Sequence, residues 1–115
     1  RRPAIEQKEN VMPKYVLAYH GGHMAESEAE QAAAMAAWGA WFGSLGDAVL
    51  DGGNPVGRSK ILAADGSATD GGGANPISGY SLVDATDLDA AVSLAKGCPI
   101  LSVGGTVEVA ETIDM

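Results

Sequence analysis

A glycine-rich stretch near the middle of the chain separates two groups of regular elements. It runs from Asp65 to Asp84 and contains two turn-forming clusters, Asp65-Gly66 and Asp70-Gly71-Gly72-Gly73, before a strand-like run. Asp-Gly and Gly-Gly pairs supply the backbone positions with positive φ that turns require. We therefore expect two halves of the chain to fold around this connection.

Alternation of strand-like and helix-like segments on both sides of this stretch predicts an α+β domain. The first half predicts elements over Lys14–His20 (strand), Ala25–Asp47 (helix), Ala48–Leu50 (strand) and Arg58–Ala64 (strand). The second half predicts elements over Ser78–Val83 (strand), Thr86–Lys96 (helix) and, within Val103–Ile113, a last strand. We expect the third and fourth strands to form a hairpin through the glycine-rich connection.

The order is then β-α-β-β-α-β, with the short strand after the first helix as an extra element. This is the ferredoxin-like pattern, in which one antiparallel sheet carries both helices on one face. The long helix has a clear start, because Ser27 and Glu30 have the spacing of a capping box, and Gly46 is its expected end. Its apolar residues recur at helical spacing and are Met35, Trp38, Phe42 and Leu45, with Trp41 beside them.

The length of 115 residues fits one domain. Residues Arg1–Val11 have no apolar periodicity, so we interpret them as a vector-derived segment or an ordinary mobile terminus. Residues 12–115 are then expected to form the single domain.

Charge and composition argue against several classes of partner. The formal net charge of −8 repels phosphate backbones, so we do not expect nucleic-acid binding. No run approaches the ~18 apolar residues of a membrane span, so no membrane partner is expected. The single cysteine, Cys98, cannot form an intrachain disulfide, which favours a reducing, cytoplasmic setting and a small buried thiol.

The first strand is apolar on both faces, with Tyr15, Leu17 and Tyr19 on one and Val16 and Ala18 on the other. A sheet with one face in water should alternate apolar and polar residues along its strands. The second face of the sheet is therefore expected to be covered, and the chain has no spare helix for it. We predict a homodimer packed sheet against sheet, since two-fold pairing is the commonest closed symmetry; a monomer with apolar surface is the alternative.

Short motifs in a consistent order resemble the YCII-related (DGPF-type) family. They cover most of the chain and are Lys14–Tyr19, Trp41–Gly52, Thr69–Gly71, Gly79–Val83, Asp89–Val92, Ala95–Pro99 and Gly104–Val109. The resemblance implies a dimeric α/β barrel; independently of it, we expect no cofactor. Some relatives look like small acid–base enzymes with a His–Asp pair, many have no known activity, and some lie near genes for alternative sigma factors, which hints at regulation.

Two departures from the family pattern bear on function. The Asp-Gly-Pro-Phe motif stands here as Asp70-Gly71-Gly72-Gly73, without the Pro-Phe pair. The catalytic histidine of those relatives lies on the first helix, near the position of Trp38, and this helix has no histidine. The catalytic pair of the family is therefore not carried over to this chain.

His20 and Asp51 are the residues whose type and position best suit proton transfer. His20 ends the first strand and could point into a cleft, and histidine is the common acid–base side chain near neutral pH. Asp51 ends a short strand before two glycines, where a carboxylate could act as a base or simply form a turn. His20 and His23 together form only a weak metal pair without a third ligand, so no metal is expected.

Four further residues are candidates for a ligand pocket. Trp38, Trp41 and Phe42 are expected in the core; if the long helix lines a cleft instead, Trp41 is the residue expected to face it, since aromatic walls are usual in apolar pockets. Tyr80 and Arg58, on the expected hairpin, could place a hydroxyl and a positive charge there. Asp70 lies in a glycine-rich loop that could cover the pocket; a plain hairpin connection is the alternative. Its glycines lack the spacing of a phosphate-binding loop.

Two hypotheses on function follow from these residues. The first is a homodimeric domain that binds a small apolar or aromatic molecule, with cofactor-free acid–base chemistry of the isomerase or lyase type by His20 or Asp51. The second is a non-catalytic module that senses a ligand or contacts a regulatory protein. The absence of a helical histidine favours the second, and the enzymes among the resembling family favour the first.

Overall fold

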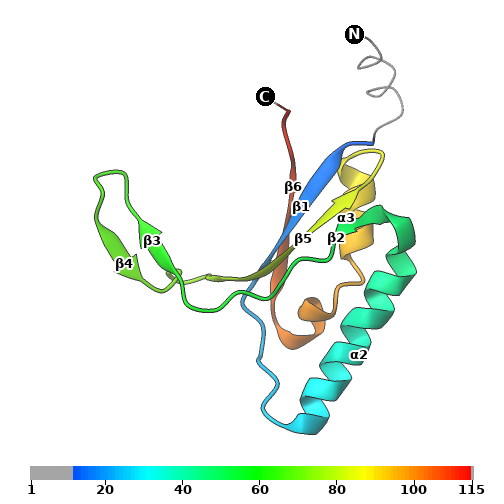
Figure 1. Ribbon diagram of the computed structural model, residues 1–115, viewed down its shortest axis with the longest axis horizontal. Helices are drawn as coiled ribbons and strands as arrows, with labels where there is room; N and C mark the ends of the chain where they lie inside the picture. The colour runs from blue at the N-terminus through cyan, green and yellow to red at the C-terminus, as the bar shows by residue number, and fades with distance from the viewer. Residues whose placement is uncertain (1–11, 115) are drawn as a thin grey trace.

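The computed structural model in Figure 1 describes residues 12–114, so the segment predicted to be a remnant lies outside the described residues. The elements follow in this order: β1 (Lys14–His20), α2 (Glu28–Leu45), η1 (Gly46–Ala48), β2 (Val49–Asp51), β3 (Lys60–Leu62), β4 (Ala68–Asp70), β5 (Ile77–Asp84), α3 (Leu88–Ala95), η2 (Pro99–Val103) and β6 (Thr106–Glu111). In the described part of the chain, no helix is both long enough and apolar enough to cross a bilayer.

Four strands form one antiparallel sheet in the order β2-β5-β1-β6. β1 lies inside the sheet and pairs with β5 on one side and β6 on the other, so that Leu17 has Ser81 and Val109 as its neighbours. β2 is the short edge strand beside β5. The α+β class predicted from the sequence is confirmed.

Local signals in the sequence explain the ends of the long helix α2. The Ser27 side chain accepts a hydrogen bond from the backbone N–H of Glu30 at 3.1 Å, which confirms the predicted helix cap. The Glu30 carboxylate accepts from the N–H of Glu26 at 2.8 Å, one residue before the cap. At the other end, Gly46 has a φ of 59° and ends the helix as predicted.

The second helix begins two residues after the predicted start at Thr86. Asp87, not Thr86, is the N-cap of α3, and its carboxylate accepts from the N–H of Ala90 at 2.8 Å. A carboxylate there also interacts favourably with the positive end of the helix. After α3, residues Pro99–Val103 form the short 3-10 helix η2.

The core lies between one face of the sheet and the two helices. Tyr15, Leu17 and Tyr19 of β1 are buried, while Val16 and Ala18 between them are only half-buried. Further buried residues come from β5, from both helices and from the segments that flank the second helix, and they are Trp41, Val83, Ala85, Ala91, Ala95, Cys98 and Ile100. Both helices therefore contribute to a core on the same face of the sheet, and the other face carries no helix (Figure 1).

The predicted hairpin of the third and fourth strands is wrong. The strand expected at Arg58–Ala64 is the shorter β3, which pairs with β4 at Ala68–Asp70 inside the glycine-rich connection. The fourth expected strand, β5, pairs with β1 and β2 instead. The short strand after the first helix is thus part of the main sheet as β2, and the β3–β4 hairpin is the extra element.

The β3–β4 hairpin extends away from the sheet and the helices in Figure 1. All of its six strand residues are exposed, including Ile61 and Leu62. Its two ends meet, because the N–H of Gly71 donates to the carbonyl oxygen of Ser59 at 2.9 Å. The hairpin is therefore a separate arm joined to the domain at one place.

Candidate functional site

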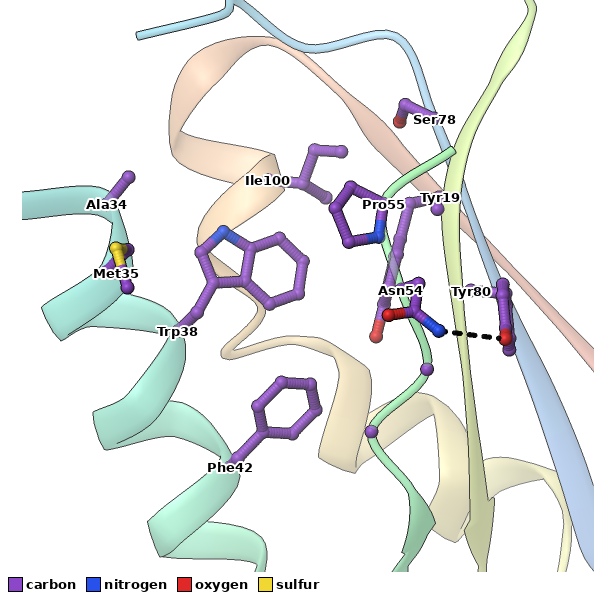
Figure 2. A pocket seen from close by; sticks show the side chains of 13 residues that line it. Tyr19, Ala34, Met35, Trp38, Phe42, Asn54, Pro55, Ser78, Tyr80 and Ile100 are labelled. Carbon is purple, nitrogen blue, oxygen red and sulfur yellow. Dashed lines mark hydrogen bonds between the residues drawn. The ribbon is translucent and has the colours of Figure 1, made fainter. Parts of the chain in front are cut away.

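An apolar pocket of about 450 Å³ lies between α2 and the loop that follows β2 (Figure 2). This volume is within the usual ~300–1,000 Å³ of small-molecule sites. The lining residues come from α2, the loop, two strands and η2, and they are Tyr19, Ala34, Met35, Trp38, Phe42, Gly52, Gly53, Asn54, Pro55, Ser78, Gly79, Tyr80 and Ile100. The pocket lies between the sheet and the long helix.

Aromatic rings form the helix side of the pocket. The ring of Trp38 lies 5.0 Å from that of Tyr19, with 72° between the planes, and 5.9 Å from that of Phe42. Edge-to-face contacts of this kind hold aromatic side chains in defined orientations. Figure 2 shows Trp38 and Phe42 projecting from successive turns of α2 toward the loop and the sheet.

The opposite side of the pocket is a main-chain segment that lies directly on β5. Gly53 has a φ of 71°, and a Cβ at this position would overlap the carbonyl oxygen of Tyr80. Only glycine allows both this backbone conformation and this approach. The turn is held by Asp51, whose carboxylate accepts a hydrogen bond from the N–H of Gly53 at 2.8 Å.

A buried chain of hydrogen bonds connects the sheet to this loop. The hydroxyl of Tyr19 donates to the Ser81 hydroxyl at 2.7 Å, and Ser81 donates to the carbonyl oxygen of Gly52 at 2.7 Å. Burial raises the pKa of Tyr19 to about 12. Tyr19 is therefore neutral near pH 7 and holds the loop rather than exchanging a proton with a ligand.

Ser78 is a polar residue of the pocket whose hydroxyl has no protein partner. Among the described residues, its Oγ and the Nε2 of His20 are the buried side-chain polar atoms without a hydrogen bond. Asn54, also in the lining, donates from its carboxamide nitrogen to the Tyr80 hydroxyl at 3.3 Å. The pocket thus combines an apolar wall with very few polar groups.

His20 is not part of this pocket. His20 follows the buried Tyr19 at the end of β1, so the two side chains lie on opposite faces of the sheet. The Nδ1 of His20 is 3.0 Å from the carbonyl oxygen of Asn75. Its Nε2 is 3.4 Å from the Glu108 carboxylate, within the range of an ion pair but without a hydrogen bond. The other histidine, His23, is exposed and 3.9 Å from the carboxylate of Glu26.

The remaining charged candidates also lie outside the lining of the pocket. Asp51 is exposed and forms the turn described above. Asp70 accepts a hydrogen bond from Lys60 at 2.7 Å, across the exposed hairpin. Arg58 is exposed just before β3. Residues 12–114 hold no group of three side chains suited to binding a metal ion.

The two aromatic candidates have different positions. Tyr80 lines the pocket and accepts the hydrogen bond from Asn54. Trp41 is only 6% exposed and does not line it; its Nε1 donates to the carbonyl oxygen of Leu94 at 3.0 Å, between the two helices. Burial also raises the pKa of the Cys98 thiol to about 11, which fits the small buried residue predicted from the sequence.

Several lining residues were not among the candidates from the sequence. Trp38, Met35 and Phe42 belong to the predicted apolar stripe of α2, and their helical spacing was the available signal. That spacing alone does not distinguish a wall of a pocket from a face in the core. Asn54 follows Gly53 in a loop-like segment and Ser78 begins the expected strand, and neither carries a sequence signal for a site.

Comparison with protein-family models and with curated proteins gives no match for this chain. The resemblance to the YCII-related family therefore depends on the short motifs and on their order along the chain.

Proposed function

We propose that this chain is a binding domain for a small apolar or aromatic molecule, which it holds in the pocket between α2 and the sheet. The observation that carries the proposal is the pocket itself, whose helix side consists of Trp38, Phe42 and Met35. Concave, mostly apolar sites with a few polar groups are the usual form of small-molecule sites. Aromatic walls favour a flat ligand that can pack against them.

The size of the apolar contact sets the expected affinity. A ligand that removes ~200 Å² of apolar surface from water gains about 5 kcal/mol, at ~25 cal/mol per Å². Loss of translational and rotational freedom opposes this gain, and preorganised aromatic contacts add to it. We therefore expect dissociation constants of roughly 10 μM to 1 mM for simple aromatic compounds.

The non-catalytic form of this function is better supported than the enzymatic one. The lining contains no His, Asp, Glu, Lys, Arg or Cys, and its buried Tyr19 has a pKa of about 12. Proton transfer near neutral pH needs a group whose pKa lies near the working pH. With His20 and Asp51 outside the lining, ligand sensing is the function that we favour over isomerase or lyase chemistry.

The arrangement of the strands supports a ferredoxin-like fold. With the β3–β4 hairpin set aside, the remaining elements follow the order β1-α2-β2-β5-α3-β6, which is β-α-β-β-α-β. This order agrees with a placement among YCII-like dimeric α/β barrels, which we retain as a proposal.

We further propose that two copies pack through the face of the sheet that carries no helix. At its centre Val16 pairs with Leu82 on one side and with Ala110 on the other, and Ala18 follows along β1. Val16, Ala18 and Leu82 are half-buried by their neighbours within the chain, although no element covers this face in Figure 1. A second copy would bury these side chains on both sheets by one two-fold contact.

Binding of small aromatic fragments, followed by protein-observed NMR, tests the proposed pocket. Trp38→Leu keeps an apolar side chain but removes the aromatic wall, so fragments that bind the wild type should bind at least about tenfold more weakly. Leu62→Ala on the exposed hairpin is the matched control and should bind as the wild type does. Failure of all fragments to bind, or equal binding to Trp38→Leu, would remove the proposal.

A further inference from the structure

We infer that the β3–β4 arm packs against the second copy of the chain, with Leu62 as its main contact. This inference deepens the proposed dimer and rests on it. Three observations carry it: the side of the sheet on which the arm extends, the hydrogen bonds that hold its base, and the exposed apolar residues along it.

The arm extends on the side of the sheet that carries no helix. In Figure 1 α2 lies on one side of the strands β1, β5 and β6, and the arm lies on the other side. The arm joins the domain at the end of β1, where Ile77 is the partner of His20, and not at the centre of the sheet around Val16. A second copy that packs on the centre of this face therefore lies next to the arm.

Backbone hydrogen bonds hold the base of the arm on the sheet. The N–H of Val56, in the segment that leads to β3, donates to the carbonyl oxygen of Ser78 at 3.0 Å. The N–H of Gly21 donates to the carbonyl oxygen of Pro76, in the segment that returns from β4, at 3.2 Å. Because both segments are attached, the domain sets the direction of the arm.

The arm is long compared with the separation of two packed sheets. The segment from Ser59 to the turn at Asp65 spans roughly 20 Å when extended at ~3.3 Å per residue. Sheets packed face to face lie about 10 Å apart. An arm that extends from the contact face therefore reaches the edge strands of the second copy. Two-fold symmetry gives two such contacts, one from each arm.

One face of the arm is apolar and offers no unpaired charge at its base. Leu62 is 72% exposed, and its cross-strand partner Ala68 lies beside it on the same face. On that face, Lys60 and Asp70 pair at 2.7 Å. Each copy has a formal net charge of −8, so two copies attract where surfaces are apolar or their charges are paired. This face of the arm meets that condition.

The arm lacks packing within its own chain. In the described part of the chain, β3 and β4 pack on each other and on no other element to a comparable extent. A hairpin of two strands is only marginally stable by itself in water, and it needs a further apolar surface to be held in place. The second copy, on the side to which the arm extends, supplies that surface.

The first test measures the dissociation constant of the dimer by sedimentation velocity over a dilution series. Replacing Lys60–Asp70 by Asn-Gly removes the arm and should weaken the dimer at least about tenfold. Leu62→Asp should weaken it about tenfold, because it places a charge in an apolar contact. Met24→Asp is the matched control, since Met24 is 81% exposed and the variant adds the same charge, and it should change the constant less than about twofold.

The second test detects the contact itself in dimers mixed from ¹³C-labelled and unlabelled copies. Isotope-filtered NMR should show nuclear Overhauser effects between the Leu62 methyl protons of one copy and protons of the other. Fragment binding by Leu62→Asp should equal that of the wild type, because Leu62 does not line the pocket. That comparison shows that the variant is folded.

The outcomes separate this inference from the proposed dimer. If the wild type sediments as a single chain, the sheet-to-sheet dimer and the arm contact both fail. If the wild type is a dimer but Leu62 shows no effect between copies, the arm inference is wrong and the dimer stands. The inference is also wrong if removal of the arm leaves the dissociation constant unchanged, or if Met24→Asp weakens the dimer as much as Leu62→Asp.

Discussion

Four aromatic side chains contact one another, but they differ in whether they lie in the core or line the pocket. Tyr19, Trp38, Trp41 and Phe42 form a chain of ring contacts with centroid distances between 5.0 and 6.4 Å. Trp41 faces the second helix and is buried, whereas Trp38 and Phe42 face the pocket. Substitutions in this group should therefore separate stability from binding.

Trp41→Ala should lower the free energy of unfolding by about 3–5 kcal/mol, because it leaves a cavity between the helices and an unpaired carbonyl at Leu94. Trp41→Phe, which keeps a ring but not the N–H, should cost less than Trp41→Ala. Urea denaturation followed by circular dichroism measures both. Met35→Ala is the control, since Met35 is 76% exposed, and it should change stability by less than about 0.5 kcal/mol. An equal loss for Trp41→Ala and Met35→Ala would contradict the placement of Trp41 in the core.

Deprotonation of the Cys98 thiol should lower the free energy of unfolding at high pH. Its pKa is raised from 9.0 to about 11 in the folded chain, so the folded state binds the proton more tightly than the unfolded state. The contribution of Cys98 to the free energy of unfolding is therefore fully present below about pH 9 and is lost as the pH rises toward about 11. Tyr19, whose pKa is raised to about 12, adds a loss at still higher pH.

Urea denaturation of the wild type and Cys98→Ala between about pH 8 and about pH 11 measures this dependence. The stability difference between the two proteins should shrink as the pH rises, because the variant lacks the thiol. Parallel pH curves for the two proteins would show that Cys98 titrates as an ordinary exposed thiol.

The assignment of Trp41 and Trp38 shows what sequence periodicity leaves open. Both residues belong to the apolar side of α2, three positions apart, and an alanine-rich helix gives little further indication of which one points to the core. The rotation of the helix is decided by the contact of Trp41 with Leu94, which lies 53 positions away in the chain. His20 presents the same difficulty, because both faces of β1 are apolar.

At the scale of the elements, helix caps, helix ends and single strands were predicted correctly from neighbouring residues, whereas the pairing of the strands was not. The cap at Ser27, the stop at Gly46, and the strands β1 and β5 follow from residues close together in sequence. β4 was missed because only Thr69 in its three residues favours a strand, among glycines that favour turns. The Asp65-Gly66 turn closes a much shorter loop than a pairing of β3 with β5 would need, and short loops lose less entropy.

The β3–β4 hairpin should be dispensable for folding of the sheet. Replacing Lys60–Asp70 by Asn-Gly joins Ser59 to Gly71, which already share a hydrogen bond of 2.9 Å. The shortened chain should keep cooperative unfolding, with a melting temperature within about 5 °C of the wild type, since the removed strands are exposed. Circular dichroism melting checks this. Loss of cooperative unfolding would mean that the arm packs on its own domain.

At the scale of the whole molecule, the proposed dimer would cover the face of the sheet that carries no helix. The chain carries exposed apolar residues at several places, but the row formed by Val16 and Leu82 lies on the face of the sheet that carries no helix, where we propose that a second copy packs. Sheets packed face to face bury alternate residues of both strands.

Leu82→Lys should convert a dimer into a monomer, because it places a charge at the centre of the proposed contact. Val92→Lys, on the partly exposed surface of α3, is the matched control and should leave the dimer intact. Light scattering coupled to size exclusion at micromolar concentration measures both. A wild-type chain with the mass of a single copy would remove the sheet-to-sheet dimer, and with it the agreement with a dimeric barrel.

Gly53 has a consequence for how such a protein could acquire a new ligand. Because the loop beside it rests on β5 through main-chain atoms, larger side chains there would displace the loop before they reshaped the pocket. Redesign of ligand preference therefore has to work from the helix, where Ala34 and Met35 line the pocket outside the aromatic contacts. Bulk added or removed at those two sites would change which molecules fit, while the loop and the sheet keep their present positions.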